Sequence, residues 1–322
     1  LQPDLVKARW CYAWSLLILG DFKRGWAWYE CRSGLQEWSS RLRQWAELGF
    51  TLTKPKWNGE ALAGRRILLL VEPGFGDTFQ FVRYVPMVAE RGGSVILACG
   101  SEQLRLFQCL NQYARVITHP PDCEFDVYCP VGSLPQIFKT DLGTIPVTTP
   151  YLWAEGELIA KWKARAPREG LRVGVIWSGN APRTTGRGIA LRQLTPLFRV
   201  PGVWFVSLQK NEAALQIREA PELAIADWGR ELSDFAETAA LMANLDLIIS
   251  IDTATAHLAG ALGRPVWTLL PFGADWRWLL NRADSPWYLT MRLFRQPKPG
   301  DWETPITQVA QALAAMTGRQ GE

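Results

Sequence analysis

The sequence of 322 residues has few histidines, no CxxC pair and no long apolar run. Only His119 and His257 are present, so a histidine-rich or thiolate zinc site is not expected. Any nucleophilic triad would have to use one of these two imidazoles. No run approaches the roughly 18 apolar residues of a membrane span, and the first ten residues lack the apolar core of a signal peptide. We therefore expect a cytoplasmic protein without a transmembrane segment.

The charges are nearly balanced and the apolar content is high. A formal net charge of +4 from 35 basic and 31 acidic residues does not favour nucleic acid as a partner, because that requires basic residues gathered on one face. An anionic small ligand is compatible with this charge. With 48% hydrophobic residues, the chain can form two domains of roughly 100–150 residues. The 17 tryptophans are expected to fill cores and interfaces, with a stacking platform for a ligand as the alternative.

Residues 8–32 have the pattern of two short amphipathic helices that break at Gly20-Asp21. Glycine is typical of a helix end and aspartate of a helix start. The order of small, aromatic and glycine positions resembles one tetratricopeptide repeat, and an ordinary helical hairpin fits the same residues. A single repeat cannot bury its own face, so we expect this hairpin to continue a longer array or to dock on the next domain. We also expect it to offer a contact for a protein partner.

From residue 65 onward, short apolar runs alternate with helical stretches. This alternation is typical of βαβ units, so we predict an α/β protein with two parallel-sheet domains joined near residues 155–170. A last helix is expected at about residues 303–316. The expected strands are RRILLLVE (65–72), SVILACG (94–100), DVYCP (126–130), RVGVIWSG (172–179), VWFVSLQ (203–209), LAIADW (223–228), LDLIISID (245–252) and PVWTLLP (265–271).

A glycine-rich turn follows the first expected strand. Open α/β sheets bind ligands at the carboxyl ends of their strands, and Gly74 and Gly76 would let a molecule approach the backbone closely. Asp77 has two interpretations, the N-cap of the next helix or a general base, and Glu72 on the strand end is the second candidate for the base. The spacing is GxGD rather than GxGxxG, so a nicotinamide cofactor is not indicated.

A second candidate turn, residues 252–257, follows the expected strand 245–252. It would present hydroxyls and backbone N–H groups at a helix N-terminus, which is a favourable place for a diphosphate. His257 lies in the first turns of that helix, where it could donate to a phosphate or be a core histidine. Asp252 could instead cap the helix.

Three basic residues are candidates for the same ligand. Lys210 follows the expected strand 203–209, so it points to the same sheet edge as the second turn, unless it is a solvated loop lysine. The loop 180–188 holds Arg183 and Arg187 on either side of a glycine. We expect this loop either to close over an anionic donor or to be exposed without a role.

Together these segments resemble a known family over about residues 57–316. They look like the bacterial tetratricopeptide-repeat glycosyltransferases, which have a domain similar to glycosyltransferase family 9, the heptosyltransferases, and more distantly similar to O-linked N-acetylglucosamine transferase. The resemblance rests on RRILLLVEPGFGDTFQFVRYVP (65–86), RVGVIWSGN (172–180), VSLQK (206–210), ISIDTATAHLAGALGRPVWTLLP (249–271) and DWRWLLNRADSPWY (275–288).

The resemblance implies the GT-B architecture, in which two Rossmann-like domains face each other, here preceded by a short all-α hairpin. Its domains would be a helical segment at 1–54, an acceptor-side domain at 55–160, a nucleotide-sugar-binding domain at 161–302, and a crossing helix and tail at 303–322. Asp77 matches the aspartate proposed as general base in heptosyltransferases, and Lys210 matches the lysine that neutralises the donor diphosphate. Asp252, Thr253, Thr255 and His257 match the donor-phosphate turn.

The implied reaction is inverting and uses neither a metal nor a cofactor. A sugar would pass from a nucleotide-diphosphate donor, expected to be UDP-linked, to a protein or glycan acceptor. The donor half contains no DxD element, which agrees with a metal-independent reaction. Two alternatives are a nucleotide-sugar epimerase of the same architecture and a non-catalytic, repeat-linked binding scaffold.

Overall fold

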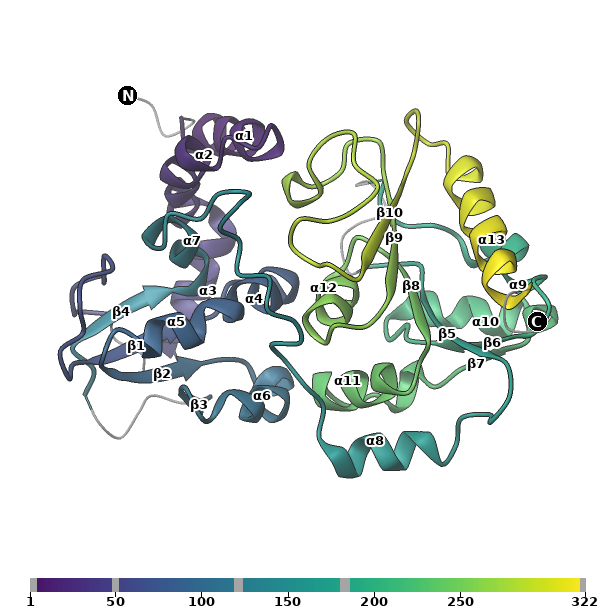
Figure 1. Cartoon of the computed structure of the whole chain (residues 1–322). Helices are drawn as coiled ribbons and strands as arrows, with labels where there is room; N and C mark the ends of the chain where they lie inside the picture. The colour runs from purple at the N-terminus through teal and green to yellow at the C-terminus, as the bar shows by residue number, and fades with distance from the viewer. Residues whose placement is uncertain (1–4, 48–51, 119–123, 180–185, 319–322) are drawn as a thin grey trace. The chain divides into compact units, whose positions relative to one another are not determined.

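The computed structural model describes residues 5–47, 52–118, 124–179 and 186–318, and it divides into two compact units. Unit 1 comprises residues 1–148 and 276–280, and unit 2 comprises residues 149–275 and 281–322. The chain therefore passes from one unit to the other at three peptide bonds. Figure 1 colours the chain by residue number. Among the described residues, none of the helices combines the length and apolar character needed to cross a bilayer.

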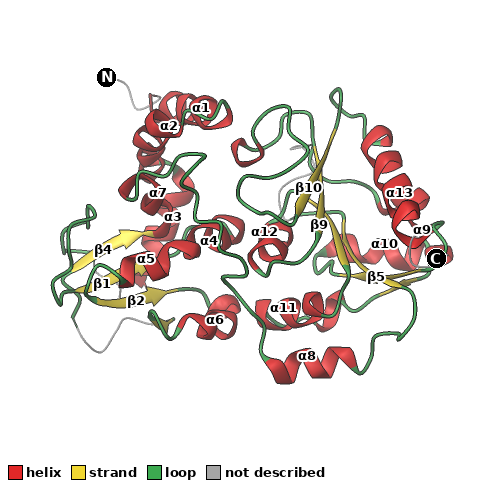
Figure 2. Ribbon diagram, viewed as in Figure 1, coloured by secondary structure: helices red, strands yellow, loops and turns green. Residues whose placement is uncertain are grey.

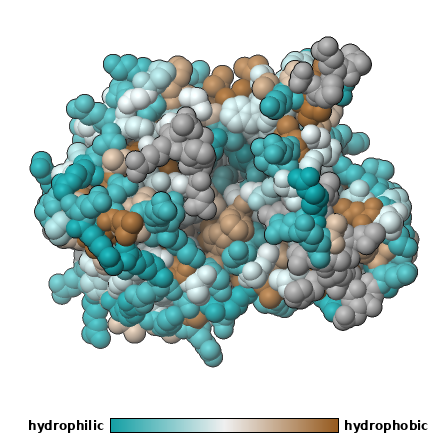
Figure 3. All heavy atoms as spheres, turned by 180° about the vertical axis from the view of Figure 1, so that it is seen from behind, coloured by the Kyte–Doolittle hydropathy of each residue, from teal (hydrophilic) through white to brown (hydrophobic). Residues whose placement is uncertain are grey.

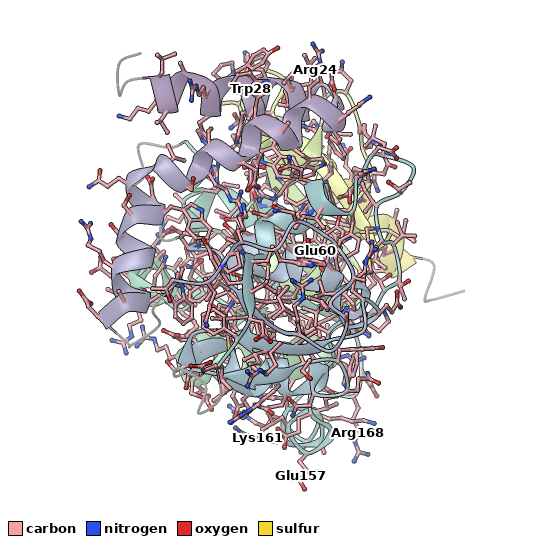
Figure 4. The ribbon with its side chains drawn as sticks, turned by 90° about the vertical axis from the view of Figure 1, so that its left-hand side faces the viewer. Arg24, Trp28, Glu60, Glu157, Lys161 and Arg168 are labelled. Atoms are coloured by element: carbon pink, nitrogen blue, oxygen red, sulfur yellow. The ribbon has the colours of Figure 1, made fainter. Side chains whose placement is uncertain are left out.

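Unit 1 begins with the helices α1 (Leu5–Ile18), α2 (Phe22–Tyr29) and α3 (Gln36–Glu47). The predicted break between the first two is confirmed. Gly20 has φ +82°, a left-handed conformation that glycine adopts at low cost. Asp21 is the N-cap of α2, and its side chain accepts from the Arg24 backbone N–H at 3.2 Å. Figure 4 shows Arg24 and Trp28 on the outer side of this helix pair.

The sheet of unit 1 is fully parallel, with strand order β3-β2-β1-β4. The strand β1 is central and its last four residues are buried. The helix predicted from about residue 77 begins at Phe75 and is interrupted by a 3-10 turn at 82–84. The elements are β1 (Arg66–Leu70), α4 (Phe75–Phe81), α5 (Val85–Ala89), β2 (Ser94–Ala98), α6 (Ser101–Phe107), β3 (Arg115–Ile117), β4 (Val127–Pro130) and α7 (Leu134–Ile137).

Unit 2 holds a second parallel sheet with strand order β10-β9-β8-β5-β6-β7. Figure 2 draws its strands in yellow. The predicted α/β class with two parallel sheets is therefore confirmed. The elements are α8 (Gly156–Lys163), β5 (Leu171–Ile176), α9 (Thr195–Phe198), β6 (Val203–Ser207), α10 (Gln216–Glu219), β7 (Ile225–Ala226), α11 (Phe235–Ala243), β8 (Leu247–Ile251), α12 (Ala254–Ala261), β9 (Val266–Leu270), β10 (Met291–Arg295) and α13 (Glu303–Gly318).

One face of this second sheet packs against α9 and α13. Alternate residues of β5 and β8, such as Val173 and Ile249, enter a core that also contains Leu197 and Val309. Helix α8 lies in the stretch where the joint between domains was expected, and it packs on α11. Its buried Trp162 donates from Nε1 to the Glu237 carboxylate at 2.6 Å. A buried indole with a partner fixes α8 to unit 2.

The face of the molecule drawn in Figure 3 is largely polar, and its hydrophobic residues form small groups. The most exposed large apolar side chains of the described residues include Leu19, Phe272 and Leu289. Isolated apolar side chains of this kind are normal on a folded protein.

Candidate active site

The strand order of each sheet reverses at one point. In unit 2, β6 and β7 follow β5 on one side, whereas β8, β9 and β10 are added on its other side. The strand order therefore reverses between β5 and β8, and ligands of open α/β sheets bind at the carboxyl ends of the strands at such a point. In unit 1 the reversal lies between β1 and β4. The two turns singled out in the sequence follow β8 and β1.

The turn after β8 leads directly into α12. Thr253 is the N-cap residue, with extended backbone (φ −143°, ψ 170°), and its side chain makes no capping hydrogen bond. The interpretation of Asp252 as the helix cap is therefore wrong. Thr255 is buried in the first turn, and the first N–H groups of α12 point to the carboxyl edge of the sheet. The helix dipole makes this end attractive to an anion.

His257 and Asp252 lie close together behind this turn. Both are buried, with exposed fractions of 5% and 8%. The Nε2 atom of His257 is 4.0 Å from Asp252 Oδ1, and its Nδ1 is 2.8 Å from the Tyr288 hydroxyl. Arg187 reaches the same carboxylate, with Nη1 3.8 Å from Asp252 Oδ2. The structure thus brings Arg187, Asp252 and His257 together, and their role in binding a donor stays a prediction.

Lys210 lies at the end of β6, two strands from β8 across the same sheet. Its side chain is exposed, and Nζ donates to the Ser233 carbonyl at 3.4 Å. The neighbouring Gln209 is buried and joins the ends of β5 and β6. Its Oε1 accepts from the Ser178 N–H at 3.0 Å, and its Nε2 donates to Asn211 Oδ1 at 2.6 Å. This amide fixes the backbone next to the lysine.

The turn after β1 holds the aspartate predicted as cap or base. Gly74 is the N-cap residue of α4, and Asp77 stands three residues later in the first turn, so Asp77 is not the N-cap. Instead, the Arg277 guanidinium donates to Asp77 Oδ1. The carboxylate remains one-third exposed. Gly76 lies within the first turn of α4.

Glu72, at the end of β1, is bound in a different ion pair. Arg32 donates to it from Nε at 3.3 Å and from Nη2 at 3.2 Å, and the Gly132 N–H donates at 2.7 Å. Burial raises the pKa of Glu72 against the opposing effect of Arg32. Because Arg32 comes from the turn after α2, this pair ties the helical segment to the sheet. A carboxylate occupied in this way is a poor candidate for a base that must meet a substrate.

The predicted residues fall into both units. Arg187, Lys210 and the turn 252–257 belong to unit 2, whereas Gly74, Gly76 and Asp77 belong to unit 1. Arg183 lies outside the described residues. Groups of three or more metal-ligating side chains are not found within the described ranges.

Sequence reasoning missed three residues that support these sites. They are Gln209, Tyr288 and Arg277, and all three lie in the quoted motifs VSLQK and DWRWLLNRADSPWY. A charged residue between two tryptophans was the clearest available signal, because burial of an arginine requires a specific partner.

Comparison with known proteins places this geometry in context. Residues 203–274 match the glycosyltransferase family 9 (heptosyltransferase) family, a segment that runs from β6 past β9 and includes Lys210 and the turn 252–257. The chain is also 29% identical over 339 residues to Protein FlbA of Caulobacter vibrioides, covering 96% of this chain and 55% of that protein. The chain thus spans about half the length of this relative.

Two solved structures have the same fold. The E. coli ADP-heptose lipopolysaccharide heptosyltransferase II has a TM-score of 0.57 at 14% identity, covering 80% of this chain and all of that one. A glycosyl transferase family 9 structure from Veillonella parvula also has a TM-score of 0.57, at 9% identity over 78% of this chain and 98% of that one. The parallel-sheet α/β fold is therefore similar to that of the GT-B heptosyltransferases.

Proposed function

We propose that this protein transfers a sugar from a nucleotide-diphosphate donor to a glycan or protein acceptor, with inversion and without a metal. The observation that carries the proposal is the family match at residues 203–274, because it falls on the strands whose carboxyl ends hold Lys210 and the turn 252–257. Unit 2 would bind the donor, and unit 1 would supply the base.

The leaving diphosphate sets the largest electrostatic demand. When the acceptor oxygen bonds to the anomeric carbon, the bond from that carbon to the phosphate oxygen breaks and the diphosphate departs with the electron pair. Lys210, His257 and the N-terminus of α12 would stabilise that charge. Preorganised donors around such a charge are typically worth ~2.7–4 kcal/mol each. Arg187, through its ion pair with Asp252, would complete the donor side.

Asp77 would take the proton of the acceptor hydroxyl. It is the partly exposed carboxylate of the turn after β1, whereas Glu72 is engaged by Arg32. Proton transfer to a positioned base contributes ~10²–10⁴-fold to a rate. An inverting displacement needs one such base and no covalent intermediate.

Finer parts of the proposal rest on resemblance. We propose that the α1–α2 pair is tetratricopeptide-like and that the catalytic part is distantly related to O-linked N-acetylglucosamine transferase. The donor base is proposed to be uracil, and adenine is the tested alternative because one structural neighbour is an ADP-heptose enzyme. The cytoplasmic location stays a prediction.

The test is calorimetric titration with UDP and ADP, followed by transfer assays with the matching sugars. Lys210→Ala and His257→Ala should weaken nucleotide binding roughly tenfold to more than a hundredfold, since each removes a charge-assisted hydrogen bond of ~1.5–3 kcal/mol. Lys163→Ala, an exposed lysine on α8, is the matched control and should bind normally. Unchanged affinity in both site variants would refute the donor assignment.

The same preparation decides between the remaining alternatives. Transfer should persist in EDTA, and a loss of rate restored by magnesium or manganese would contradict metal independence. Isomerised donor formed without any acceptor would identify an epimerase.

A further inference from the structure

Arg277 is buried in unit 1, although the chain on both sides of residues 276–280 belongs to unit 2. It lies in a 3-10 turn at Trp276–Trp278, and its side chain is 7% exposed. Nη2 donates to Asp77 and Nε donates to the Gln80 side-chain oxygen. Both acceptors lie on α4, one turn apart. The guanidinium therefore binds one face of this short helix at two points.

The helix pair at the N-terminus sets the position of this arginine. The guanidinium carbon is 4.4 Å from the centre of the Trp276 ring and 5.8 Å from that of Phe81. Trp276 is 1% exposed, and its ring lies 5.3 Å from Trp26 and 6.0 Å from Tyr29 of α2. Stacking on aromatic faces restricts the plane of a guanidinium. The aromatic side chains of α2 thus support the turn that carries Arg277.

The other side of the Asp77 carboxylate is fixed by Gly74. A Cβ atom added at Gly74 would lie 2.5 Å from Asp77 Oδ2, which is too close for any larger residue to share the space unchanged. One oxygen of Asp77 therefore packs against the turn after β1 while the other is held by Arg277. The group stays one-third exposed, so a substrate hydroxyl can reach it.

We propose that Arg277 is a positioning residue that orients the Asp77 carboxylate for proton transfer from the acceptor, and that the α1–α2 pair holds Arg277 in place. This inference rests on the proposed function. A cation in contact with a carboxylate favours its ionised form. Arg277 therefore keeps Asp77 ionised, and able to accept a proton, at lower pH. The same contact makes the carboxylate a weaker base. The helical segment is then a part of the catalytic domain, whatever else it binds.

Titratable groups that interact with Asp77 in the described part of unit 1 include Arg277, Tyr29 on α2 and Glu72 at the end of β1. Burial raises the pKa of Tyr29 and of Glu72. The Tyr29 phenol is therefore uncharged across the working range, and Glu72 is paired with Arg32. If loss of Arg277 shifts the low-pH side of the plot of kcat against pH, the shift reports the ionisation of Asp77.

The experiment compares Arg277→Gln and Arg277→Lys with wild type in transfer rate against pH. Arg277→Gln should move the low-pH side of the kcat profile to higher pH by about 1–3 and lower kcat about 10–10²-fold, while the nucleotide Kd stays unchanged. Arg277→Lys keeps the positive charge but loses the planar guanidinium with its two donor groups. The low-pH side of the profile should therefore stay near its wild-type position, while kcat is reduced. Arg282→Gln removes an equal charge five residues away, and it should change neither quantity.

A double variant keeps the test decisive if the single variants are less stable. If Arg277 acts through Asp77, then Asp77→Asn with Arg277→Gln should be no slower than Asp77→Asn alone, because the two effects are not additive. Additive losses, or an unshifted profile in Arg277→Gln with a folded protein, would overturn the inference. Wild type that transfers no sugar from any donor would instead refute the proposed function.

Discussion

Replacement of Arg32 by methionine tests whether the helical segment is part of unit 1. Arg32 and Glu72 are each 3% exposed, and the guanidinium also donates to Ser133 Oγ at 3.0 Å. Removing one partner of a buried pair leaves a charge without compensation, at a cost of about 3–5 kcal/mol. At ~2–4 °C per kcal/mol for a unit of this size, the melting temperature of unit 1 should fall by about 6–20 °C.

The loss should depend on pH with a definite sign. Burial already raises the pKa of Glu72, and without Arg32 the pKa in the folded state rises further. Between the unfolded value of about 4.3 and that raised value, the folded state holds a proton that the unfolded state has lost. Stability then falls as pH rises, by up to ~1.4 kcal/mol per pH unit. The deficit of Arg32→Met relative to wild type should therefore be smallest near pH 4–5 and largest near pH 8.

Scanning calorimetry at several pH values measures both effects. Arg32→Met combined with Glu72→Gln removes the buried carboxylate, so it should reduce the growth of the deficit with pH to the part that comes from Glu30, whose Oε1 lies 2.7 Å from Arg32 Nη1. Arg65→Met is the control in the same unit, because its ion pair with Glu60 is half exposed and should contribute no more than about 1 kcal/mol. A deficit below about 1 kcal/mol in Arg32→Met, equal at pH 5 and pH 8, would show that this pair does not hold the helical segment.

Two substitutions test the close contacts of unit 2. In Gly260→Ala the new Cβ would lie 2.3 Å from the Tyr288 ring, so the ring must shift and disturb the hydrogen bond between its hydroxyl and His257. A loss of about 1–3 kcal/mol is expected by melting, and the proposed donor site predicts weaker nucleotide binding by calorimetry. In Gly229→Ala the Cβ would lie 2.2 Å from the Gln209 backbone oxygen, which cannot turn aside, so the melting temperature should fall clearly. Gly273→Ala, where nothing lies within 4 Å, is the control for both, and equal melting of all three variants would contradict these contacts.

Much of the fold could be predicted because parallel strands that are buried on both faces consist of continuous runs of apolar residues in the sequence. The strands β1, β2, β5 and β8 were found in this way. The strand β3 has only three residues, which is too short for a pattern to emerge. Helix α8 was interpreted as part of the joint between domains because a polar stretch begins at its end, at 163–170. It belongs to unit 2, where Trp162 is buried and both Lys161 and Trp162 donate to the Glu237 carboxylate.

The candidate site was only partly predictable, since local motifs name residues but not their distant partners. The turn 252–257 was found from its own sequence. Its ion pair with Arg187 forms because the loop that carries Arg187 lies beside the turn. Arg277 stands 200 positions after Asp77, and no spacing rule links such residues. The N-cap interpretations of Asp77 and Asp252 failed for a related reason, because the exact first residue of a helix depends on backbone geometry that composition does not fix.

The excursion of residues 276–280 into unit 1 has a consequence for dissecting the protein. Because the chain passes between the units at three peptide bonds, a single cut at 148–149 gives two fragments that do not correspond to the two units. The first fragment would lack Trp276 and would expose the aromatic side chains of α2 that surround it. The second would carry Trp276 and Arg277 without the surfaces that bury them. The fragments are therefore complementary, and each is incomplete until the other supplies its missing piece.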